Sequence, residues 1–131
     1  MNYQRAWAEI NHAHIAHNLR AVRGLLPERT KLMAVVKGDA YGHGIVPVAE
    51  TLLANGANAL GVAICEEGIV LREAGITAPI LIMGFTPDPL LHETVKRDLV
   101  QTVFNPSGAE ALAQAAKQAQ TDWATFTGAK R

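Results

Sequence analysis

The residues best suited to chemistry lie in one short stretch, Lys37 to Gly44, directly after the apolar run Leu32 to Val36. A lysine amine at the end of a buried strand loses hydration, which lowers its pKa and frees its lone pair to form a Schiff base with a carbonyl. A glycine-rich loop that leads into a helix can also receive an anion. A simpler interpretation is a turn with a solvated lysine, whose glycines supply positive φ. Spacing and residue types leave both interpretations open.

The glycines of this stretch do not form a nucleotide-binding loop of either common kind. The pattern G-x-x-x-x-G-K-[ST] is absent from the sequence. Gly42, His43 and Gly44 begin like the dinucleotide pattern G-x-G-x-x-G, but Pro47 stands where the third glycine should be. The stretch therefore predicts neither of these phosphate loops.

Metal ligation and paired-carboxylate chemistry have weaker candidates. The spacing of His12, His14 and His17 could suggest a metal cluster. On a helix, however, His12 and His14 point to different faces, so solvated or capping histidines are expected and no metal site. Glu66 and Glu67 are adjacent, and their side chains diverge by about 100° on a helix. They cannot face each other as an acid/base pair.

Continuous apolar runs alternate with helical patterns along the chain. The runs, bounded by turn residues and typical of strands buried on both faces, are 32–36, 59–63, 80–83 and 100–104. The helical patterns that follow them span 45–53, 65–74, 88–97 and a segment that begins at Pro106. Four βα units in a row predict a parallel sheet. They are preceded by a strand-like piece, Ala6 to Ile10, and by a helix with Ile15, Leu19, Val22 and Leu26 on one face.

Length, charge and cysteine content narrow the architecture and the partners. The 131 residues are too few for a complete (β/α)8 barrel, which needs at least ~200. The 12 Lys and Arg balance the 12 Asp and Glu, so the chain lacks the basic footprint of a nucleic-acid or membrane-surface binder. The single cysteine, Cys65, allows no intramolecular disulfide and lacks the cationic surroundings of a reactive thiolate. With no signal-like apolar stretch at the N-terminus, a cytoplasmic protein is expected.

The segment AVVKGDAYGHG, residues 34–44, resembles the cofactor-lysine signature of the alanine racemases, a family of pyridoxal-phosphate enzymes. The flanking sequence is similar as well: WAEIN at 7–11 resembles the opening strand of the family, and 17–20 its first helix. Residues 59–83 and 99–112 resemble the βα units that follow. The resemblance runs from about residue 5 to about residue 120. One departure is Gly38, where the family pattern has alanine.

The resemblance implies a role for four residues. Lys37 would hold pyridoxal 5'-phosphate as an internal aldimine and would be one of two catalytic bases. Tyr41 would donate its phenol O–H to the cofactor phosphate. Val35 and Met83 would pack near the cofactor ring. These implied contacts form a cofactor site without a metal.

The resemblance also implies a fold, a reaction and partners. The fold would be α/β, the first half of a (β/α)8 TIM-type barrel with about four parallel βα units. The reaction would be the interconversion of L-alanine and D-alanine, which supplies D-alanine for the bacterial cell wall. The second base would be a tyrosine from the carboxyl-terminal domain of the partner subunit in a homodimer. We expect neither nucleic acid nor membrane among the partners.

Residues 1–120 are thus expected to be a partial racemase barrel domain, residues 121–131 a tail outside the family pattern, and the carboxyl-terminal β-domain absent. Such a truncated chain would be inactive alone and prone to self-association. Two alternatives remain open at this point. The chain could be a module that binds pyridoxal phosphate through Lys37, or a self-associating remnant without function.

Overall fold

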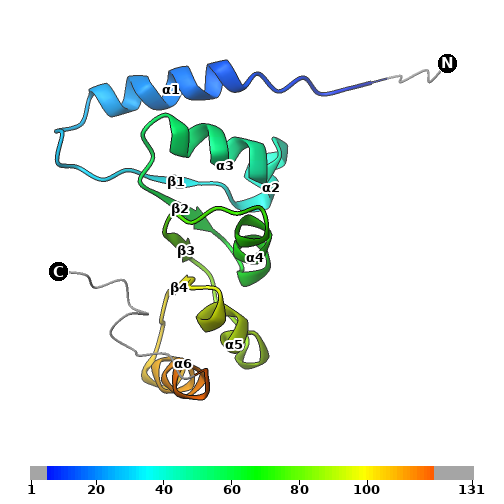
Figure 1. Ribbon diagram of the computed structural model, residues 1–131, viewed down its shortest axis with the longest axis vertical. Coiled ribbons are helices and arrows are strands. Elements are labelled where there is room, and N and C mark those ends of the chain that lie inside the picture. The colour runs from blue at the N-terminus through cyan, green and yellow to red at the C-terminus, as the bar shows by residue number, and fades with distance from the viewer. Residues whose placement is uncertain (1–5, 120–131) are drawn as a thin grey trace.

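The computed structural model describes residues 6–119, and within them four strands pair side by side in the order β1-β2-β3-β4, all parallel (Figure 1). In chain order the elements are α1 (His12–Gly24), β1 (Met33–Val35), α2 (Lys37–Gly42), α3 (Ile45–Ala54), β2 (Ala59–Val62), α4 (Cys65–Glu73), β3 (Ile80–Ile82), α5 (Asp88–Lys96), β4 (Val100–Gln101) and α6 (Pro106–Gln118). The four predicted βα units are confirmed. The expected tail, 121–131, lies outside the described residues.

One face of the sheet is covered by helices that pack against one another in sequence. Helix α3 contacts both α1 and α4, and α5 contacts both α4 and α6 (Figure 1). The core joins strand residues to helix residues, among them Leu60, Ile80, Val48, Ala49 and Leu71. No helix within residues 6–119 is long and apolar enough to cross a membrane.

The prediction that the strands are buried on both faces is wrong for β1. Ala34 is buried, but its neighbours Met33 and Val35 are 44% and 39% exposed. Successive side chains of a strand point to opposite faces, and the helices cover only the face of Ala34. The apolar run therefore reflects a buried face and an open face, which is the inner face of a half-barrel.

The prediction of a strand over Ala6 to Ile10 is also wrong. These residues are neither helix nor strand, and Trp7 is 75% exposed. A strand requires a neighbouring strand to bond its N–H and C=O groups, and Figure 1 shows the segment leading away from the sheet. Regular structure begins only after Asn11, whose side chain accepts hydrogen bonds from the N–H groups of Ala13 and His14 as the cap of α1.

The last strand is shorter than the apolar run that predicts it. Pairing in β4 ends at Gln101 although the run extends to Phe104. Among the described strands β4 has β3 as its single neighbour, and Thr102 turns its hydroxyl onto the carbonyl oxygen of Ile82 at 2.7 Å. Helix α6 then starts as predicted, with Asn105 accepting a hydrogen bond from the N–H of Gly108 at 2.8 Å and Pro106 at the first helical position.

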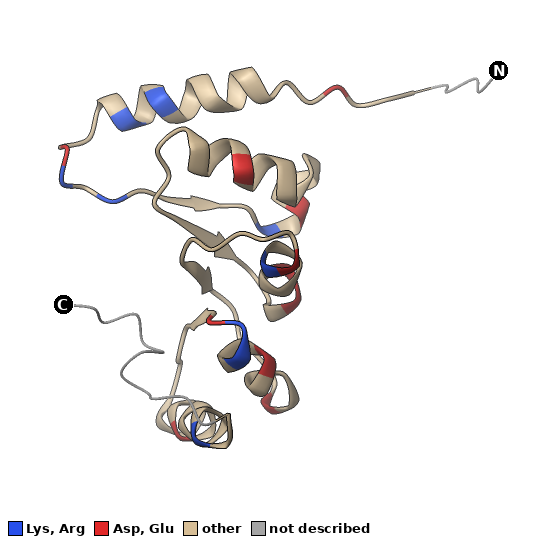
Figure 2. Cartoon of the chain, in the orientation of Figure 1, with Lys and Arg blue, Asp and Glu red and all other residues tan. Residues whose placement is uncertain are grey.

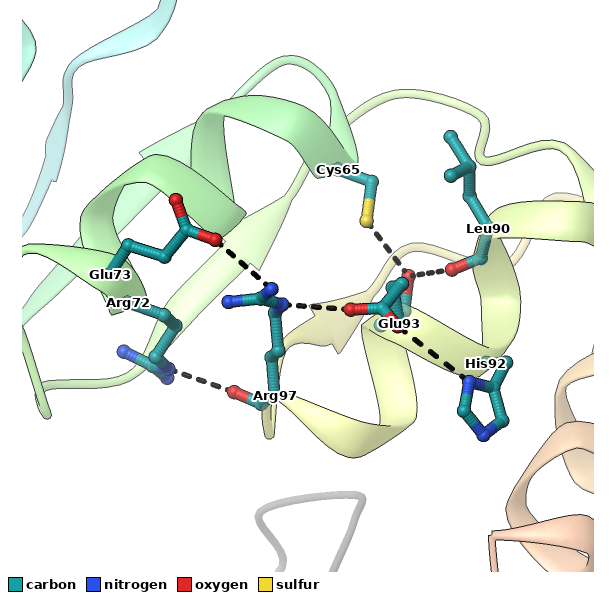
Figure 3. A network of polar contacts seen from close by, with 8 residues as sticks. Cys65, Arg72, Glu73, Leu90, His92, Glu93 and Arg97 are labelled. Atoms are coloured by element: carbon teal, nitrogen blue, oxygen red, sulfur yellow. Dashed lines mark hydrogen bonds and ion pairs between the residues drawn. The ribbon is translucent and has the colours of Figure 1, made fainter.

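A polar network joins α4 to α5 near the amino ends of β3 and β4 (Figure 3). The Arg72 guanidinium donates four hydrogen bonds of 2.8–2.9 Å to carbonyl oxygens, those of Ile76, Ala78, Arg97 and Asp98. Burial lowers the pKa of Arg72 from its usual value. Arg97 forms more exposed ion pairs with Glu73 at 3.1 Å and Glu93 at 2.9 Å.

Cys65, at the start of α4, is buried in the same region. Its Sγ lies 3.2 Å from the hydroxyl oxygen of Thr94, and burial raises the pKa of the thiol (Figure 3). A raised pKa keeps the thiol protonated at neutral pH, and a protonated thiol is a poor nucleophile. The residue packs helix against helix, in line with the sequence-based interpretation.

Arg72 and Arg97 form a matched test of this network. Replacement Arg72→Leu leaves four carbonyl oxygens without their charged donor and should lower the free energy of unfolding by about 2–3 kcal/mol. Replacement Arg97→Gln removes more exposed ion pairs and should cost much less, because exposed ion pairs contribute little to stability. Urea titration followed by circular dichroism measures both. Equal losses of unfolding free energy in the two variants would show that Arg72 does not contribute more to stability than Arg97.

Candidate active site

Lys37 stands at the carboxyl end of β1, as its place after the apolar run predicts. Val36, fully buried, donates its N–H to the carbonyl oxygen of Gly61 at 2.8 Å and is the last residue held by the sheet. Lys37 follows it and is exposed, so the loss of hydration expected for an amine at a buried strand end is not found. Because parallel strands end at one edge, the loops after β1, β2, β3 and β4 surround the same region, the edge at which βα-barrels carry their chemistry.

The chain after Lys37 forms a left-handed turn. Residues Gly38, Asp39, Ala40 and Tyr41 have φ between 53° and 63° and ψ between 37° and 46°. The glycines of the segment predict positive φ at glycine, but the three other residues are an unpredicted feature. For an L-residue the left-handed helical conformation costs roughly 1–2 kcal/mol. Strain of this kind persists where surrounding contacts determine the backbone, often at functional sites.

Hydrogen bonds hold the turn from several sides. The N–H of Ala40 donates to the carbonyl oxygen of Val36 at 2.8 Å, and that of Gly44 to the carbonyl oxygen of Asp39 at 3.0 Å. His43 Nδ1 lies 3.0 Å from the carbonyl oxygen of Ala40 and 3.1 Å from that of Tyr41. Since carbonyl oxygens only accept, Nδ1 carries the proton. Both His43 and Asp39 contact the loop itself, as a loop-shaping role requires.

Asp39 also closes the start of α3. Its Oδ1 accepts the N–H of Ile45, the first residue of that helix, at 2.7 Å. The N-cap position is Gly44, which has no side chain to supply this acceptor. Asp39, six residues earlier in the chain, therefore caps the helix and connects the strained turn to it.

Val35 and Met83 come together on the open face of the sheet, around Gly61. A Cβ atom at Gly61 would lie 3.4 Å from Val35 Cγ2, 3.5 Å from Met83 Sδ and 3.6 Å from Met33 Sδ. Any side chain at position 61 would occupy the space between them. The structure thus brings two of the four predicted site residues together and adds Gly61, which sequence reasoning missed because a glycine inside an apolar run has no distinct signal.

Tyr41 lies at the other end of the turn from Lys37 and is 63% exposed. Its backbone is engaged by His43, whereas the ring extends into solvent. Lys37 and Tyr41 are therefore both accessible side chains at the carboxyl end of β1, on opposite ends of one rigid turn. Exposure leaves the phenol hydroxyl free to meet a ligand.

Glu67 is a second residue of the site that the sequence analysis did not assign. Its carboxylate accepts the N–H of Gly38 on Oε1 at 2.6 Å and the N–H of Ala63 on Oε2 at 2.8 Å. Of the two adjacent acids, it is Glu67 whose carboxylate accepts a hydrogen bond from the turn. A glutamate at the third position of a helix predicts a contact with the residue before the helix. Nothing in the sequence points to Gly38.

The edge of the sheet continues past β3 and β4 in a pocket lined by Phe85, Thr86, Gln101, Thr102 and Asn105, among others. Its polar groups bond one another: the Thr86 hydroxyl donates to Gln101 Oε1 at 2.6 Å, and Gln101 Nε2 donates to the carbonyl oxygen of Gly84 at 2.8 Å. At this part of the edge, after β3 and β4, the polar side chains are therefore held by hydrogen bonds to one another and to the backbone.

Charge is distributed without a dominant sign. Figure 2 shows basic and acidic residues scattered over the described helices and loops.

Within residues 6–119 no group of three His, Cys, Asp or Glu side chains is placed to hold a metal ion. His12, the first of the three histidines considered above, bonds the Thr51 hydroxyl through Nδ1 at 3.0 Å.

Parallel βα units with an accessible lysine at the carboxyl end of the first long strand define the first half of a (β/α)8 barrel domain. Residues 10–125 match the family model described as "Alanine racemase, N-terminal domain". The chain belongs to the alanine racemase family through this domain.

Individual relatives agree with this assignment. Alanine racemase 1 of Oceanobacillus iheyensis is 46% identical over 116 residues, which are 88% of this chain and 31% of the relative. The alanine racemase of Clostridium difficile 630 has a TM-score of 0.85 at 40% identity, with 90% of this chain and 31% of that chain covered. A crystal structure of alanine racemase from Bacillus anthracis with bound L-Ala-P has a TM-score of 0.81 at 37% identity, covering 88% and 30%. The chain spans about a third of the length of these relatives.

The contact between Asp39 and α3 can be tested by two substitutions. Asp39→Ala removes the acceptor for the Ile45 N–H and should lower the free energy of unfolding by about 1–2 kcal/mol. Asp39→Asn keeps an oxygen at the same place and a residue type that tolerates positive φ, so it should lose much less. Urea midpoints of the two variants give the comparison. An asparagine variant as unstable as the alanine variant would show that the acceptor oxygen is unimportant.

Proposed function

We propose that this chain carries the cofactor-binding lysine of an alanine racemase, with Lys37 as the residue that holds pyridoxal 5'-phosphate. The observation that supports it most strongly is the accessible lysine between a buried strand end and a strained, braced turn, in a chain of this family. The proposed reaction is the interconversion of L-alanine and D-alanine in the cytoplasm, as a source of D-alanine for the cell wall. The proposed assembly of the complete enzyme is a homodimer.

The residues present fit a flat aromatic cofactor with a phosphate. Val35 and Met83, whose side chains lie next to Gly61, would pack against the ring. The phenol of Tyr41, exposed at the end of the turn, would donate a hydrogen bond to the phosphate. The cofactor, when bound, supplies an electron sink that makes the α-proton of an amino acid acidic enough to remove.

Lys37 serves twice in this proposal. Its Nζ would hold the cofactor at its aldehyde carbon, and the same amine, when free, would remove or return the α-proton on one face of the substrate. Because Lys37 is exposed, its Nζ can reach a ligand. The hydrogen-bonded backbone on either side of Lys37 restricts the positions that Nζ can take. A second acid/base must act on the opposite face, and by the family resemblance it is a tyrosine of the partner subunit's carboxyl-terminal domain.

A second candidate, a self-associating half-barrel, is favoured by the open sheet. Within the described sheet β1 and β4 each have one neighbouring strand, and exposed apolar side chains include Met33, Val35, Phe85 and Phe104. Unpaired strand edges and exposed apolar faces both promote association. A chain that only associates would not bind pyridoxal phosphate selectively, and a chain that only binds the cofactor would not interconvert alanine enantiomers.

Selective capture of pyridoxal phosphate by Lys37 tests the proposal. Mixing should produce a visible absorbance band, and reduction with borohydride should fix the label on Lys37 in preference to Lys31 and Lys96. Replacement Lys37→Gln should abolish the band, whereas Lys31→Gln should leave it unchanged. Peptide mapping by mass spectrometry locates the label. Label spread evenly over the three lysines would refute the proposed site.

A chiral assay on the same preparation separates the candidate activities. We expect turnover of alanine by this chain alone at or near background, because the second base comes from another domain. Label on Lys37 without turnover fits a cofactor-holding part of a racemase. Neither label nor turnover, together with large particles in light scattering, fits the associating half-barrel. Robust turnover would require a second base within these 131 residues.

Tyr41 should contribute to the capture of the phosphate. A phenol O–H that donates to a charged phosphate is worth about 1.5–3 kcal/mol, so Tyr41→Phe should weaken binding of pyridoxal phosphate roughly tenfold or more. The variant keeps the ring and the same backbone strain, so the urea midpoint should not change. Titration of the absorbance band measures the affinity. An unaltered affinity would mean that the ring packs but the hydroxyl does not meet the phosphate.

A further inference from the structure

The carboxylate of Glu67 makes contacts that the proposed roles of Lys37 and Tyr41 do not explain. We propose that Glu67 is a positioning residue, which clamps the turn after Lys37 to the end of β2 and thereby directs the lysine amine. This inference rests on the proposed function, because it concerns the same lysine. It adds a residue from a different βα unit to the machinery of the site.

The clamp is a single carboxylate between two strand ends. Oε1 accepts the N–H of Gly38, 29 residues away in sequence, at 2.6 Å. Oε2 accepts the N–H of Ala63 at 2.8 Å and, at 3.4 Å, that of Ile64. Gly38 follows Lys37, and Ala63 follows the last residue of β2. Both oxygens are thus engaged, and each holds a different strand end.

A helix cap alone would not need this arrangement. Glu67 stands at the third position of α4, where a glutamate commonly accepts the N–H of the residue before the helix, here Ile64. That role uses one oxygen. The bond from Gly38 uses the other, and it comes from a segment that has no part in capping α4. Glu66, the neighbouring acid in the same first turn, has an exposed side chain.

The turn needs an external clamp because its backbone is strained. Gly38 is its first left-handed residue, with φ of 63°, and glycine is the residue with the greatest backbone freedom. Asp39 anchors the far side of the turn on α3, and the Gly38 N–H is the anchored group that directly follows Lys37. Loss of the bond would free the backbone next to the reactive amine.

The test compares Glu67→Gln with Glu66→Gln in the 131-residue chain. Glutamine has the same size, but one of its two terminal groups donates, so it cannot accept both the Gly38 and the Ala63 N–H groups. With pyridoxal phosphate as the probe, Glu67→Gln should reduce borohydride-fixed label on Lys37 about tenfold, the effect of losing one charge-assisted hydrogen bond. Label on Lys31 and Lys96 should stay constant, and Glu66→Gln should match the parent chain.

Amide hydrogen exchange without any cofactor provides an independent readout. In Glu67→Gln the amides of Gly38 and Ala63 should exchange faster, while those of the core residues Leu60 and Val62 keep their rates. Unchanged protection of Gly38 overturns the clamp. Faster exchange throughout the core, in parallel with loss of label, also overturns it, because the role is then general stability.

Two further outcomes separate this inference from the proposed function. Even label on all lysines in the parent chain refutes the proposed function, and the role for Glu67 falls with it. Selective label on Lys37 that survives Glu67→Gln refutes only the positioning role.

A second variant, Glu67→Asp, keeps the charge but is one methylene too short to span both strand ends. It should lose Lys37 label like the glutamine variant, and full recovery would overturn the clamp in favour of charge alone.

Discussion

The register between β1 and β2 is the constraint on which the candidate site depends. Val35 pairs with Gly61, and the N–H of Val36 donates to the carbonyl oxygen of Gly61 at 2.8 Å. This pairing places the residue without a side chain beside Val35. It also brings the two strand ends close enough for one carboxylate to bond both. A shift by one residue would turn every side chain of β1 to the opposite face, taking Val36 out of the core.

Burial on the helix-covered face determines that register. The strand residues on this face are all buried: Ala34, Val36, Leu60, Val62, Ile80 and Ile82. Fully burying a side chain the size of valine, leucine or isoleucine contributes about 1.5–3 kcal/mol. The free-energy cost of a slip that exposed several of them would therefore exceed any gain on the other face. The open face is under no such demand. It therefore carries the exposed side chains of Met33 and Val35, which lie next to Gly61.

Helix α4 braces the half-barrel at both ends. Near its first turn Glu67 holds the carboxyl ends of β1 and β2, where we place the chemistry. Near its last turn Arg72 holds the segments that precede β3 and β4 through four carbonyl oxygens. A rigid support of this kind allows the strained turn after Lys37 to persist, because the turn cannot relax without breaking bonds to elements that are themselves anchored.

Sequence by itself determined the elements and the place of Lys37 at a strand end. Apolar runs, helical periodicity and turn residues are local signals, and they predict four parallel βα units, the helix start at Asn105 and the lysine at the end of β1. The family resemblance adds cofactor contacts to these predictions only where residues match its motif. Those signals fail where strand formation depends on a neighbouring strand. Ala6 to Ile10 has strand-like residues but no strand to pair with among the described residues, and β4 ends early at Gln101.

Only the tertiary structure decided which distant residues meet. Gly61 lies beside Val35 because β2 pairs with β1, and Glu67 reaches Gly38 because α4 follows the neighbouring strand. The left-handed conformation of Asp39, Ala40 and Tyr41 opposes the local preference of all three residues. The turn is held by hydrogen bonds to Val36, to α3 and to α4. The bond between Gly38 and Glu67 joins residues 29 apart in the chain, so it leaves no periodic trace in sequence.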